Sequence, residues 1–396
     1  MKIESIHLQN FKVFQAVEIN DIPSFCVIVG ANGAGKSTLF DVFGFLKDSL
    51  AFNVTRAIQS RGGFRELVSR GHERESIKIE IQFRTVINRA NRLVSYLIEI
   101  AQDEKGRPVI EREILRYKRG PQGKPFHFLD FMRGKGFAIS NEEDFDKAEE
   151  ELRREEQQVD PDILAIKGLG QFQRFKAANA FRQFIENWNV SDFHINLARG
   201  SKDVAGIDEH LSKTGDNLQL AANYLYENHR SIFDTILIKM QQRVPGMGAI
   251  TPEPTADGRL LLKFQDGSFK DPFIDKYVSD GTIKMFAYLV LLYDPAPHPL
   301  LCVEEPENQL YPALLTELAE EFRDYARRGG QVFVSTHSPD FLNATELDEV
   351  FWLVKQAGYT QVRRAKDDAQ LSAYMKSGDQ MGYLWKEGFF EGADPR

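Results

Sequence analysis

One nine-residue stretch, Gly30–Thr38, constrains this chain more than any other. Its sequence, GANGAGKST, fits the spacing G-x-x-x-x-G-K-[ST]. Glycines are needed in such a loop because successive backbone N–H groups must turn toward a single anion, a bend that side chains would obstruct. Lys36 is then expected to reach the outer phosphates, and the Ser37 hydroxyl to hold Mg²⁺. The residues expected to bind the nucleotide are Asn32, Gly33, Ala34, Gly35, Lys36, Ser37 and Thr38.

The flanking sequence supports this interpretation. Residues 24–29 are a short apolar run rich in β-branched side chains, typical of a buried strand, and residues 39–46 continue as a helix. A helix that starts at the loop points its positive end at the bound phosphates. An ordinary glycine-rich turn that fits the pattern by chance is therefore the weaker reading.

Composition limits the other classes of protein. The 396 residues carry a formal net charge of −8, so the chain as a whole is not a polycation that coats nucleic acid. Cys26 and Cys302 both fall in apolar runs, which favours buried thiols in a reducing compartment over a disulfide or a metal site. The N-terminus lacks the apolar core of a signal peptide, and the longest apolar run, 285–293, is about half a membrane span. We therefore expect a cytoplasmic protein that does not enter a membrane.

The first part of the chain reads as β structure. Residues 3–22 predict a strand pair, with a turn at Asn10-Phe11-Lys12. Strict apolar alternation over 77–83 and 94–100, and a looser pattern over 109–117, predicts an antiparallel meander. Between them, residues 47–75 contain several arginines, Arg61 among them, that read as a solvated face or, less favoured, as a loop at the nucleotide.

The middle of the chain reads as mostly helical. A cluster of Gly and Pro at 120–125 breaks the strand pattern, and helical spacing then follows over 142–158, 171–188 and 216–244. From 259 onward, strands and helices alternate, which indicates a parallel sheet with helices packed on it. The sequence thus predicts a nucleotide-binding α/β domain in two parts, 1–119 and 256–396, with a mainly helical insertion at 120–255.

Two apolar strands in the last part end in polar side chains. Residues 300–303 run into Glu304 and Glu305, and residues 331–335 run into Thr336 and His337. Strands that end beside a phosphate loop deliver their side chains to the bound phosphates. Glu304 is expected in the Mg²⁺ shell, and Glu305 is expected to accept a proton from the attacking water. An exposed acidic turn that includes Glu307, and a structural role for His337, are the alternatives.

A third segment adds a further anion site. Ser279, Asp280 and Gly281 form a small turn at the start of the helix predicted over 283–293, and helix N-termini attract anions. The order of the four segments is phosphate loop, Ser-Asp-Gly, Glu-Glu strand and Thr-His-Ser strand. In this order the chain resembles ATP-binding-cassette ATPases of the SMC/RecF type, most closely stand-alone bacterial AAA-family ATPases of the RecF/OLD-like group. The resemblance covers 1–100 and 255–396, with further likeness at Asn10–Lys12, 304–312, 336–339 and 381–385.

The resemblance implies an α/β P-loop NTPase head of the ABC type, with ATP and Mg²⁺ held between two copies. Each ATP would lie between Lys36 of one subunit and Ser279–Gly281 of the other. Glu305 would be the general base and His337 the switch residue. The chain departs from the family pattern at Glu304, where Asp is usual, and at Asp280, where many relatives have Gly. Gln59 is a candidate for the glutamine loop.

Three functions compete. In the first, ATP-driven dimerisation controls a separate effector, such as a nuclease, in DNA repair or phage defence; no second catalytic centre is visible in the sequence. In the second, the ATPase binds DNA directly through residues 105–135, where nine Lys and Arg face three acids. A strand edge guarded by basic residues explains that charge equally well. In the third, the chain is a P-loop kinase of small molecules, in which the Ser-Asp-Gly turn would have no role.

Overall fold

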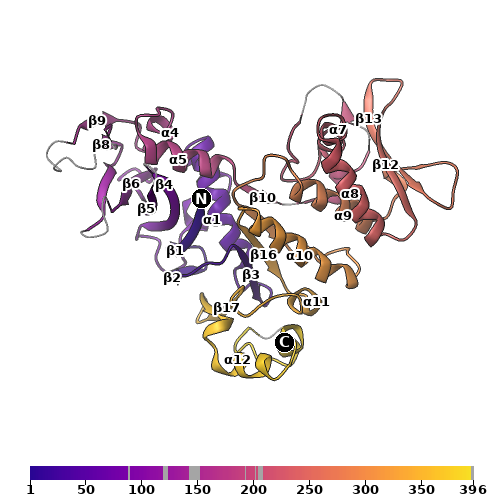
Figure 1. Ribbon diagram of the computed structural model, residues 1–396. Coiled ribbons are helices and arrows are strands. Elements are labelled where there is room, and N and C mark those ends of the chain that lie inside the picture. The colour runs from indigo at the N-terminus through magenta and orange to yellow at the C-terminus, as the bar shows by residue number, and fades with distance from the viewer. Residues whose placement is uncertain are drawn as a thin grey trace. The chain divides into compact units, whose positions relative to one another are not determined.

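The chain folds into two compact units of α/β structure (Figure 1). Unit 1 comprises Met1–Trp188, Glu346–Asp379 and Leu384–Arg396, and unit 2 comprises Asn189–Thr345 and Gln380–Tyr383. The computed structural model describes residues 1–87, 90–118, 124–141, 152–191, 193–200, 202–203 and 208–393. The first unit is therefore assembled from both ends of the sequence.

Unit 1 contains an antiparallel sheet of eight strands in the order β2-β1-β4-β5-β6-β7-β8-β9. Its strands are β1 (Lys2–Phe11), β2 (Phe14–Ile19), β4 (Ile77–Ile87), β5 (Ala90–Gln102), β6 (Pro108–Tyr117), β7 (Phe126–Met132), β8 (Lys135–Ile139) and β9 (Arg154–Gln158). The alternation that predicted β4 and β5 sets their register, in which Ile79 faces Ile98 and Ile81 faces Tyr96. The meander predicted from the sequence is therefore present.

The apolar face of this sheet is covered by helix α5 (Lys176–Glu186). The ring of Phe181 stacks on Phe83 of β4 at 4.4 Å between centroids and lies 4.6 Å from Tyr96 of β5. Trp188, just beyond the helix, packs edge-on against Phe43 at 5.5 Å. Through α5 and Trp188, these aromatic contacts connect the sheet to α1 (Lys36–Ala51), the helix that follows the phosphate loop. They therefore hold α1 in place beside the sheet.

A second set of strands in unit 1 carries the loop. Strand β3 (Phe25–Gly30) is buried along its whole length and pairs in parallel with β17 (Val350–Gln356), which pairs antiparallel with β18 (Tyr359–Arg364). The helices of this unit are α1 (Lys36–Ala51), α2 (Val54–Gln59), α3 (Phe64–Leu67), α4 (Ala165–Leu169), α5 and α12 (Ala369–Lys376); α13 (Met381–Lys386) follows near the end of the chain. A continuous apolar run such as β3 is what a strand buried on both faces requires.

Unit 2 is built on a short parallel sheet. Strands β10 (Asn189–Ser191), β15 (Leu301–Glu304) and β16 (Val332–Thr336) pair in that order, with Cys302 opposite Phe333. The helices of the unit are α6 (Ile195–Ala198), α7 (Leu218–Asn228), α8 (Arg230–Arg243), α9 (Asp280–Leu292), α10 (Ala313–Arg327) and α11 (Pro339–Leu342). A smaller antiparallel sheet contains β11 (Lys202–Asp203), β12 (Met247–Pro254), β13 (Arg259–Asp266) and β14 (Phe273–Ile274). The parallel strands bring two polar strand ends, at Glu304 and Thr336, to the same edge.

A buried acid lies inside unit 1. Glu113 of β6 accepts hydrogen bonds from the backbone amides of Ala165 (2.5 Å) and Ile166 (3.0 Å) at the start of α4, and from the Tyr96 hydroxyl at 3.0 Å. Burial penalises the carboxylate more than these donors stabilise it, and raises the pKa of Glu113 from 4.5 to about 7. Helix α4 is thereby hydrogen-bonded to β6 through the Glu113 carboxyl group, whose pKa lies near neutrality.

Three features differ from the sequence predictions. The helix predicted over 142–158 is wrong for 154–158, which form β9 at the edge of the sheet; residues 142–151 lie outside the described residues. The sheet continues through β7, β8 and β9, and the division between the units falls after Trp188 rather than at residue 120. The helix predicted over 216–244 is divided into α7 and α8 at His229. Backbone pairing with β8 outweighs the charged, helix-favouring sequence of β9.

Two expectations about apolar segments can be compared with the fold. Cys26 and Cys302 are both fully buried, as predicted. The apolar run at 285–293 belongs mostly to α9, whose side chains are buried from Thr282 to Leu292. Within the described part of the chain, no helix combines the length and the apolar character that crossing a bilayer demands.

Candidate functional site

The phosphate loop connects β3 to α1, as the motif requires. Gly33 and Gly35 have positive φ angles of 77° and 106°, a conformation that non-glycine residues rarely adopt. A Cβ on Gly35 would lie 2.8 Å from Cγ2 of Val13, whereas a Cβ on Gly33 would meet open space. Gly35 is thus required both by backbone conformation and by close packing, and Gly33 by conformation alone.

The Lys36 ammonium is held inside the loop. Its Nζ donates hydrogen bonds to the carbonyl oxygens of Gly30 (2.8 Å) and Ala31 (3.4 Å), and the residue is only 6 % exposed. A buried cation among backbone carbonyls fits an anionic ligand, because phosphate oxygens supply a stronger counter-charge than the carbonyls do. The loop therefore has the chemistry of a phosphate site, with backbone amides and one ammonium.

Thr360 of β18 forms a hydrogen bond to the phosphate loop, and no sequence signal identified this residue. Its hydroxyl donates a hydrogen bond to the Ala34 carbonyl oxygen at 2.7 Å, and its backbone amide donates to the Val13 carbonyl oxygen at 2.8 Å. Thr360 is 2 % exposed. The fold of the loop therefore depends on a residue that lies far away in the sequence, on the C-terminal hairpin.

An ion-pair cluster lies on α1 just after the loop. Asp41 accepts from Lys12 Nζ at 2.6 Å and from Arg61 Nε at 2.7 Å, and Arg61 also contacts Asp48 at 2.9 Å. The Arg61 side chain is only 11 % exposed. The interpretation favoured from the sequence, that this arginine belongs to a solvated face, is therefore wrong. The cluster ties the Asn10–Lys12 turn, where Lys12 has a φ of 49°, to the first turns of α1.

In unit 2, Glu305 occupies a strained position directly after β15. Its φ is 42°, in the left-handed region, which costs a residue other than glycine on the order of 1–3 kcal/mol. The conformation is held by a hydrogen bond from its amide to the Ser335 carbonyl oxygen (2.9 Å) and by one from Asn308 Nδ2 to its carboxylate (3.2 Å). The backbone is thus fixed so that one carboxylate is presented at the end of the strand.

His337 lies next to this carboxylate. Its Nδ1 is 3.4 Å from Glu305 Oε1 and 3.5 Å from Glu307 Oε1. Glu307, by contrast, is turned inward, where Oε1 accepts from the Thr336 hydroxyl (2.8 Å) and from the His337 amide (2.9 Å). The exposed acidic turn considered from the sequence is therefore not what forms: Glu307 positions the His337 backbone, a role the sequence did not reveal.

A buried lysine supports the same turn. Lys284 of α9 donates a hydrogen bond from Nζ to the Asn308 carbonyl oxygen at 2.7 Å. Burial lowers the pKa of Lys284 to about 8, although the nearby carboxylates of Glu307 and Glu305 oppose the shift. The turn after β15 is thus held by the hydrogen bond from Lys284 and by the backbone hydrogen bond from the Glu305 amide to Ser335 of β16.

The Ser-Asp-Gly turn caps α9. The Ser279 hydroxyl accepts from the Thr282 amide at 3.2 Å, and Asp280 is paired with Arg199. A Cβ on Gly281 would lie 2.8 Å from the Gln309 carbonyl oxygen, so the start of α9 packs closely on the turn that follows Glu305. Ser279 and Asp280 are exposed, which the predicted contact with a second copy would require.

The remaining predicted residues are placed as follows. Ser37 lies in the first turn of α1 and Glu304 at the end of β15; both offer oxygen, the ligand that Mg²⁺ prefers. Gln59, the glutamine-loop candidate, is exposed at the end of α2. Within unit 1 the structure brings the loop residues together around Lys36, and within unit 2 it brings together Glu305 and His337. The roles predicted for these residues remain predictions.

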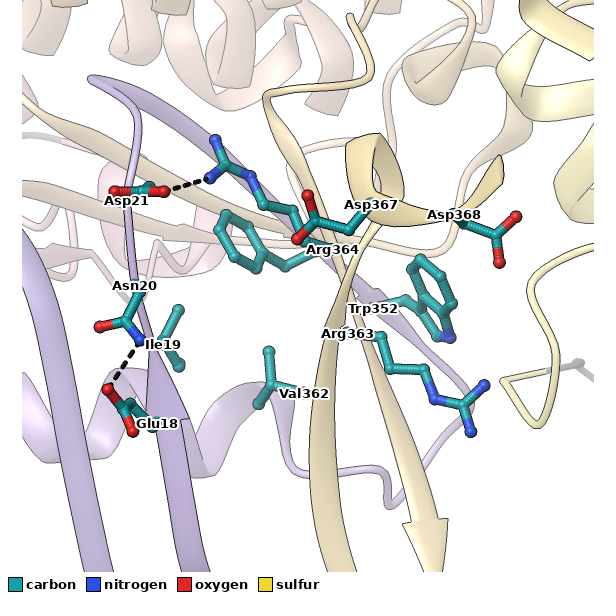
Figure 2. A pocket seen from close by; sticks show the side chains of 11 residues that line it. Glu18, Ile19, Asn20, Asp21, Trp352, Val362, Arg363, Arg364, Asp367 and Asp368 are labelled. Carbon is teal, nitrogen blue, oxygen red and sulfur yellow. Dashed lines mark hydrogen bonds and ion pairs between the residues drawn. The ribbon is translucent and has the colours of Figure 1, made fainter. Parts of the chain in front are cut away.

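A separate hollow in unit 1 has a volume of about 400 Å³ and includes no residue of the phosphate loop (Figure 2). It lies between β2, β17 and β18, with Trp352 and Val362 among its apolar side chains. Arg364 faces Asp21 at 3.7 Å there. Because acids and arginines are mixed on its walls, the hollow lacks the excess of positive charge that a nucleotide phosphate requires.

Comparison with known proteins identifies the family. The model of the family described as "AAA domain, putative AbiEii toxin, Type IV TA system" matches residues 25–343, which run from the start of β3 to just after α11. The chain belongs to this AAA-domain family. Among curated protein sequences, none matches the chain.

Solved structures agree with the AAA-domain assignment at the level of fold. An SMC head bound to the C-terminal winged-helix domain of ScpA has a TM-score of 0.58 and 15 % identity, over 92 % of this chain and 98 % of that one. The SMC head of Pyrococcus furiosus with an extended coiled coil, bound to the C-terminal domain of ScpA, has a TM-score of 0.51 and 14 % identity, over 95 % and 99 %. The fold expected from the sequence, that of an ABC-type, SMC-like head, is confirmed.

Proposed function

We propose that this AAA-domain protein is a Mg²⁺-dependent ATPase whose ATP-bound form dimerises and controls a separate effector. Membership of a family of nucleotide-hydrolysing P-loop proteins supports hydrolysis in general. The observation that carries the proposal further is the pair formed by Glu305 and His337, 3.4 Å apart at the end of β15 and β16. A carboxylate held in a strained backbone beside an imidazole suits proton transfer from a water molecule.

Each residue of the predicted site has a definite task in this proposal. The loop amides and Lys36 bind the phosphates, and the ammonium neutralises charge on the outer phosphate oxygens. Glu305 accepts the proton of the attacking water, while His337 contacts the reacting phosphate and Glu307 positions His337 through its backbone amide. Mg²⁺, with Ser37 and Glu304 as its expected protein ligands, would supply charge neutralisation to the β- and γ-phosphates.

The exposed Ser-Asp-Gly turn supports the proposed dimerisation. In the proposed dimer, ATP bound by one copy contacts Ser279 and Gly281 of the partner subunit, where the N-terminus of α9 offers backbone amides. The turn is capped by Ser279 and packed against the Gln309 carbonyl oxygen, so it meets the nucleotide as a rigid surface. ATP therefore acts as the contact between subunits, and hydrolysis separates them.

Replacing Glu305 by Gln tests this proposal. The Glu305→Gln chain should bind ATP, lose turnover by a factor on the order of 10²–10⁴ through loss of the proton acceptor, and accumulate as a dimer. ATP turnover and sizing by light scattering, with ATP and Mg²⁺, are the measurements. Glu227→Gln, which changes an exposed carboxylate on α7, is the control and should leave both unchanged. A Glu305→Gln chain that stays monomeric with bound ATP would refute the sandwich.

The effector is proposed as a separate chain, a nuclease, in DNA repair or phage defence. The part of the family match that supports a defence setting is its description as a putative toxin of a toxin–antitoxin system. Capture with the Glu305→Gln chain, which holds the ATP state, should retain the effector in an ATP-dependent way. Equal recovery with ADP would contradict control by dimerisation.

Direct DNA binding through residues 105–135 remains the alternative, but ion pairs lower its support. Four arginines of this segment form ion pairs at 2.7 to 3.0 Å: Arg107 with Asp103, Arg112 with Asp130, Arg116 with Glu80, and Arg133 with Glu111. Arg119 lies outside the described residues. Each paired arginine offers less charge to a phosphate backbone, so the local excess of positive charge is smaller than the sequence suggested. Neutralising Arg116 and Lys118 should leave DNA affinity at low salt unchanged; a loss of affinity with a shallower salt dependence would favour this alternative.

The kinase hypothesis is separated from hydrolysis by its product. A kinase transfers phosphate to an acceptor molecule, whereas the proposed ATPase releases inorganic phosphate without one. Measuring phosphate release in buffer that contains only ATP and Mg²⁺ therefore decides between them, since release requires water as the acceptor.

A further inference from the structure

Unit 2 contains a cluster of two imidazoles and one carboxylate that the proposed ATPase does not use. His210, Asp294 and His298 each offer one ligand atom, and these three atoms lie within 4.8 Å of one another. The nearest pair is His210 Nδ1 and Asp294 Oδ2, at 2.7 Å, and the rings of His210 and His298 have their centroids 5.6 Å apart. The ion pair accounts for the first contact, and a ring nitrogen of His298, whose Nε2 lies 3.4 Å from Asn189 Nδ2, is within 4.8 Å of both ligand atoms.

The carboxylate is buried and oriented. The Asp294 side chain is 3 % exposed, and its second oxygen, Oδ1, accepts from the Ala296 amide at 2.8 Å. Oδ2 is thereby left to face His210. A buried carboxylate is stabilised by a cation or by several donors around it, and a metal ion bound also to the two imidazoles meets that need.

All three side chains come from segments whose backbone is fixed. Asp294 and His298 alternate with prolines in the sequence Asp-Pro-Ala-Pro-His-Pro over 294–299, which limits the conformations of that segment. The His298 carbonyl oxygen accepts from the Tyr325 hydroxyl at 2.7 Å, and the His210 carbonyl oxygen accepts from Asn217 Nδ2 at 2.9 Å. The three groups are therefore positioned before any ion arrives, which lowers the entropic cost of binding one.

We propose that His210, Asp294 and His298 form a Zn²⁺ site with two nitrogen ligands, one carboxylate oxygen and a water molecule. Two histidines and a carboxylate are a donor set of zinc sites with one open position, whereas Mg²⁺ and Ca²⁺ prefer oxygen ligands. Zinc bonds of about 2.0–2.1 Å place tetrahedral ligand atoms roughly 3.4 Å apart, which small side-chain rotations within this cluster achieve. His210, 43 % exposed, leaves an opening for the ion and its water.

The site would join three parts of unit 2. Asp294 lies just beyond the C-terminal end of α9, His298 lies ahead of β15, and His210 belongs to the segment before α7. A metal ion there ties that segment to the end of α9 without touching the phosphate loop or the Glu305 turn. Its effect is on the stability of unit 2, so the inference does not depend on the proposed ATPase.

Zinc competition with the full chain tests the site. The protein is stripped with a chelator and titrated with Zn²⁺ against a chromogenic chelator, without nucleotide. We expect one tight site per chain and a melting temperature that rises with Zn²⁺. The conservative change His210→Gln removes a ligand; because loss even of a group behind a ligand costs 10- to 100-fold in metal affinity, removing the ligand should cost about 100-fold or more.

His298→Gln should weaken binding to a similar extent, and His229→Gln is the matched control. His229 is a histidine of the same unit whose ring contacts the Tyr224 hydroxyl at 3.3 Å, so its replacement should leave zinc affinity unchanged. His210 is partly exposed, so His210→Gln is expected to fold even if a change at buried Asp294 does not. Unchanged zinc affinity in His210→Gln, or no tight site in the parent chain, would overturn the proposal.

Discussion

Glu113 gives the sharpest quantitative prediction about stability. Its pKa is raised from 4.5 to about 7 because the carboxyl group is buried between β5, β6 and α4. A carboxyl group with a raised pKa in the folded state binds its proton more tightly there than in the unfolded chain. Its contribution is therefore fully present below pH 4.5 and is lost as the pH rises through about 7.

The magnitude follows from the same two values. The interval from 4.5 to about 7 corresponds to roughly 3 kcal/mol of unfolding free energy, at about 1.4 kcal/mol per pH unit. Glu113→Gln keeps the shape of the side chain but cannot ionise. The difference in unfolding free energy between the parent and the variant should therefore shift by about 3 kcal/mol in favour of the variant across this window.

Urea denaturation of both chains at several pH values between 4.5 and 8 measures this difference. Glu111→Gln on the same strand is the control, since it removes a surface ion pair with Arg133 that is worth about 0–1 kcal/mol. If the difference between the parent and Glu113→Gln is the same at pH 5 and pH 8, Glu113 is not the titrating group and the reasoning fails.

Three further predictions concern the phosphate loop. Gly35→Ala should abolish binding of a fluorescent ATP analogue, because the added methyl group meets Val13 at 2.8 Å; a dissociation constant within tenfold of the parent would contradict this. Thr360→Val removes the donor to a buried carbonyl oxygen, which costs about 1–3 kcal/mol, and should weaken nucleotide binding about tenfold or more. The same titration measures it, and an unchanged value would show that the hydrogen bond does not shape the loop. Asp41→Asn leaves two cations without their shared carboxylate and should lower the melting temperature while Lys36 still binds ATP; an unchanged melting temperature would contradict a structural role for the cluster.

Local patterns allowed much of the fold to be predicted from the sequence. The segment β3–loop–α1 was predicted from a motif with fixed spacing, and β4 and β5 were predicted from strict alternation of apolar residues. Both signals depend only on residues that are neighbours in the sequence. The Glu305 and His337 strand ends were also predicted, since each follows an apolar run. The prediction failed at β9, where an exposed and charged sequence forms a strand only because β8 offers it a partner.

The contacts that complete each site come from distant parts of the chain. Thr360 and Ala34 are separated by 326 positions, and His210 and Asp294 by 84, so no spacing rule connects them. Glu307 was visible in the sequence, but its inward rotation depends on the backbone of β16. These residues form their sites through the tertiary fold, which no window of sequence contains.

The support of the loop by β18 has a consequence for protein synthesis. The hydrogen bond from Thr360 can form only after residue 360 has left the ribosome, since β17 and β18 are made after the segment of unit 2 that ends at Thr345. A nascent chain therefore carries its nucleotide motif long before it can hold that motif in shape. Premature termination ahead of residue 350 would release a polypeptide that has the glycine-rich signature but neither of the two strands on which the signature rests.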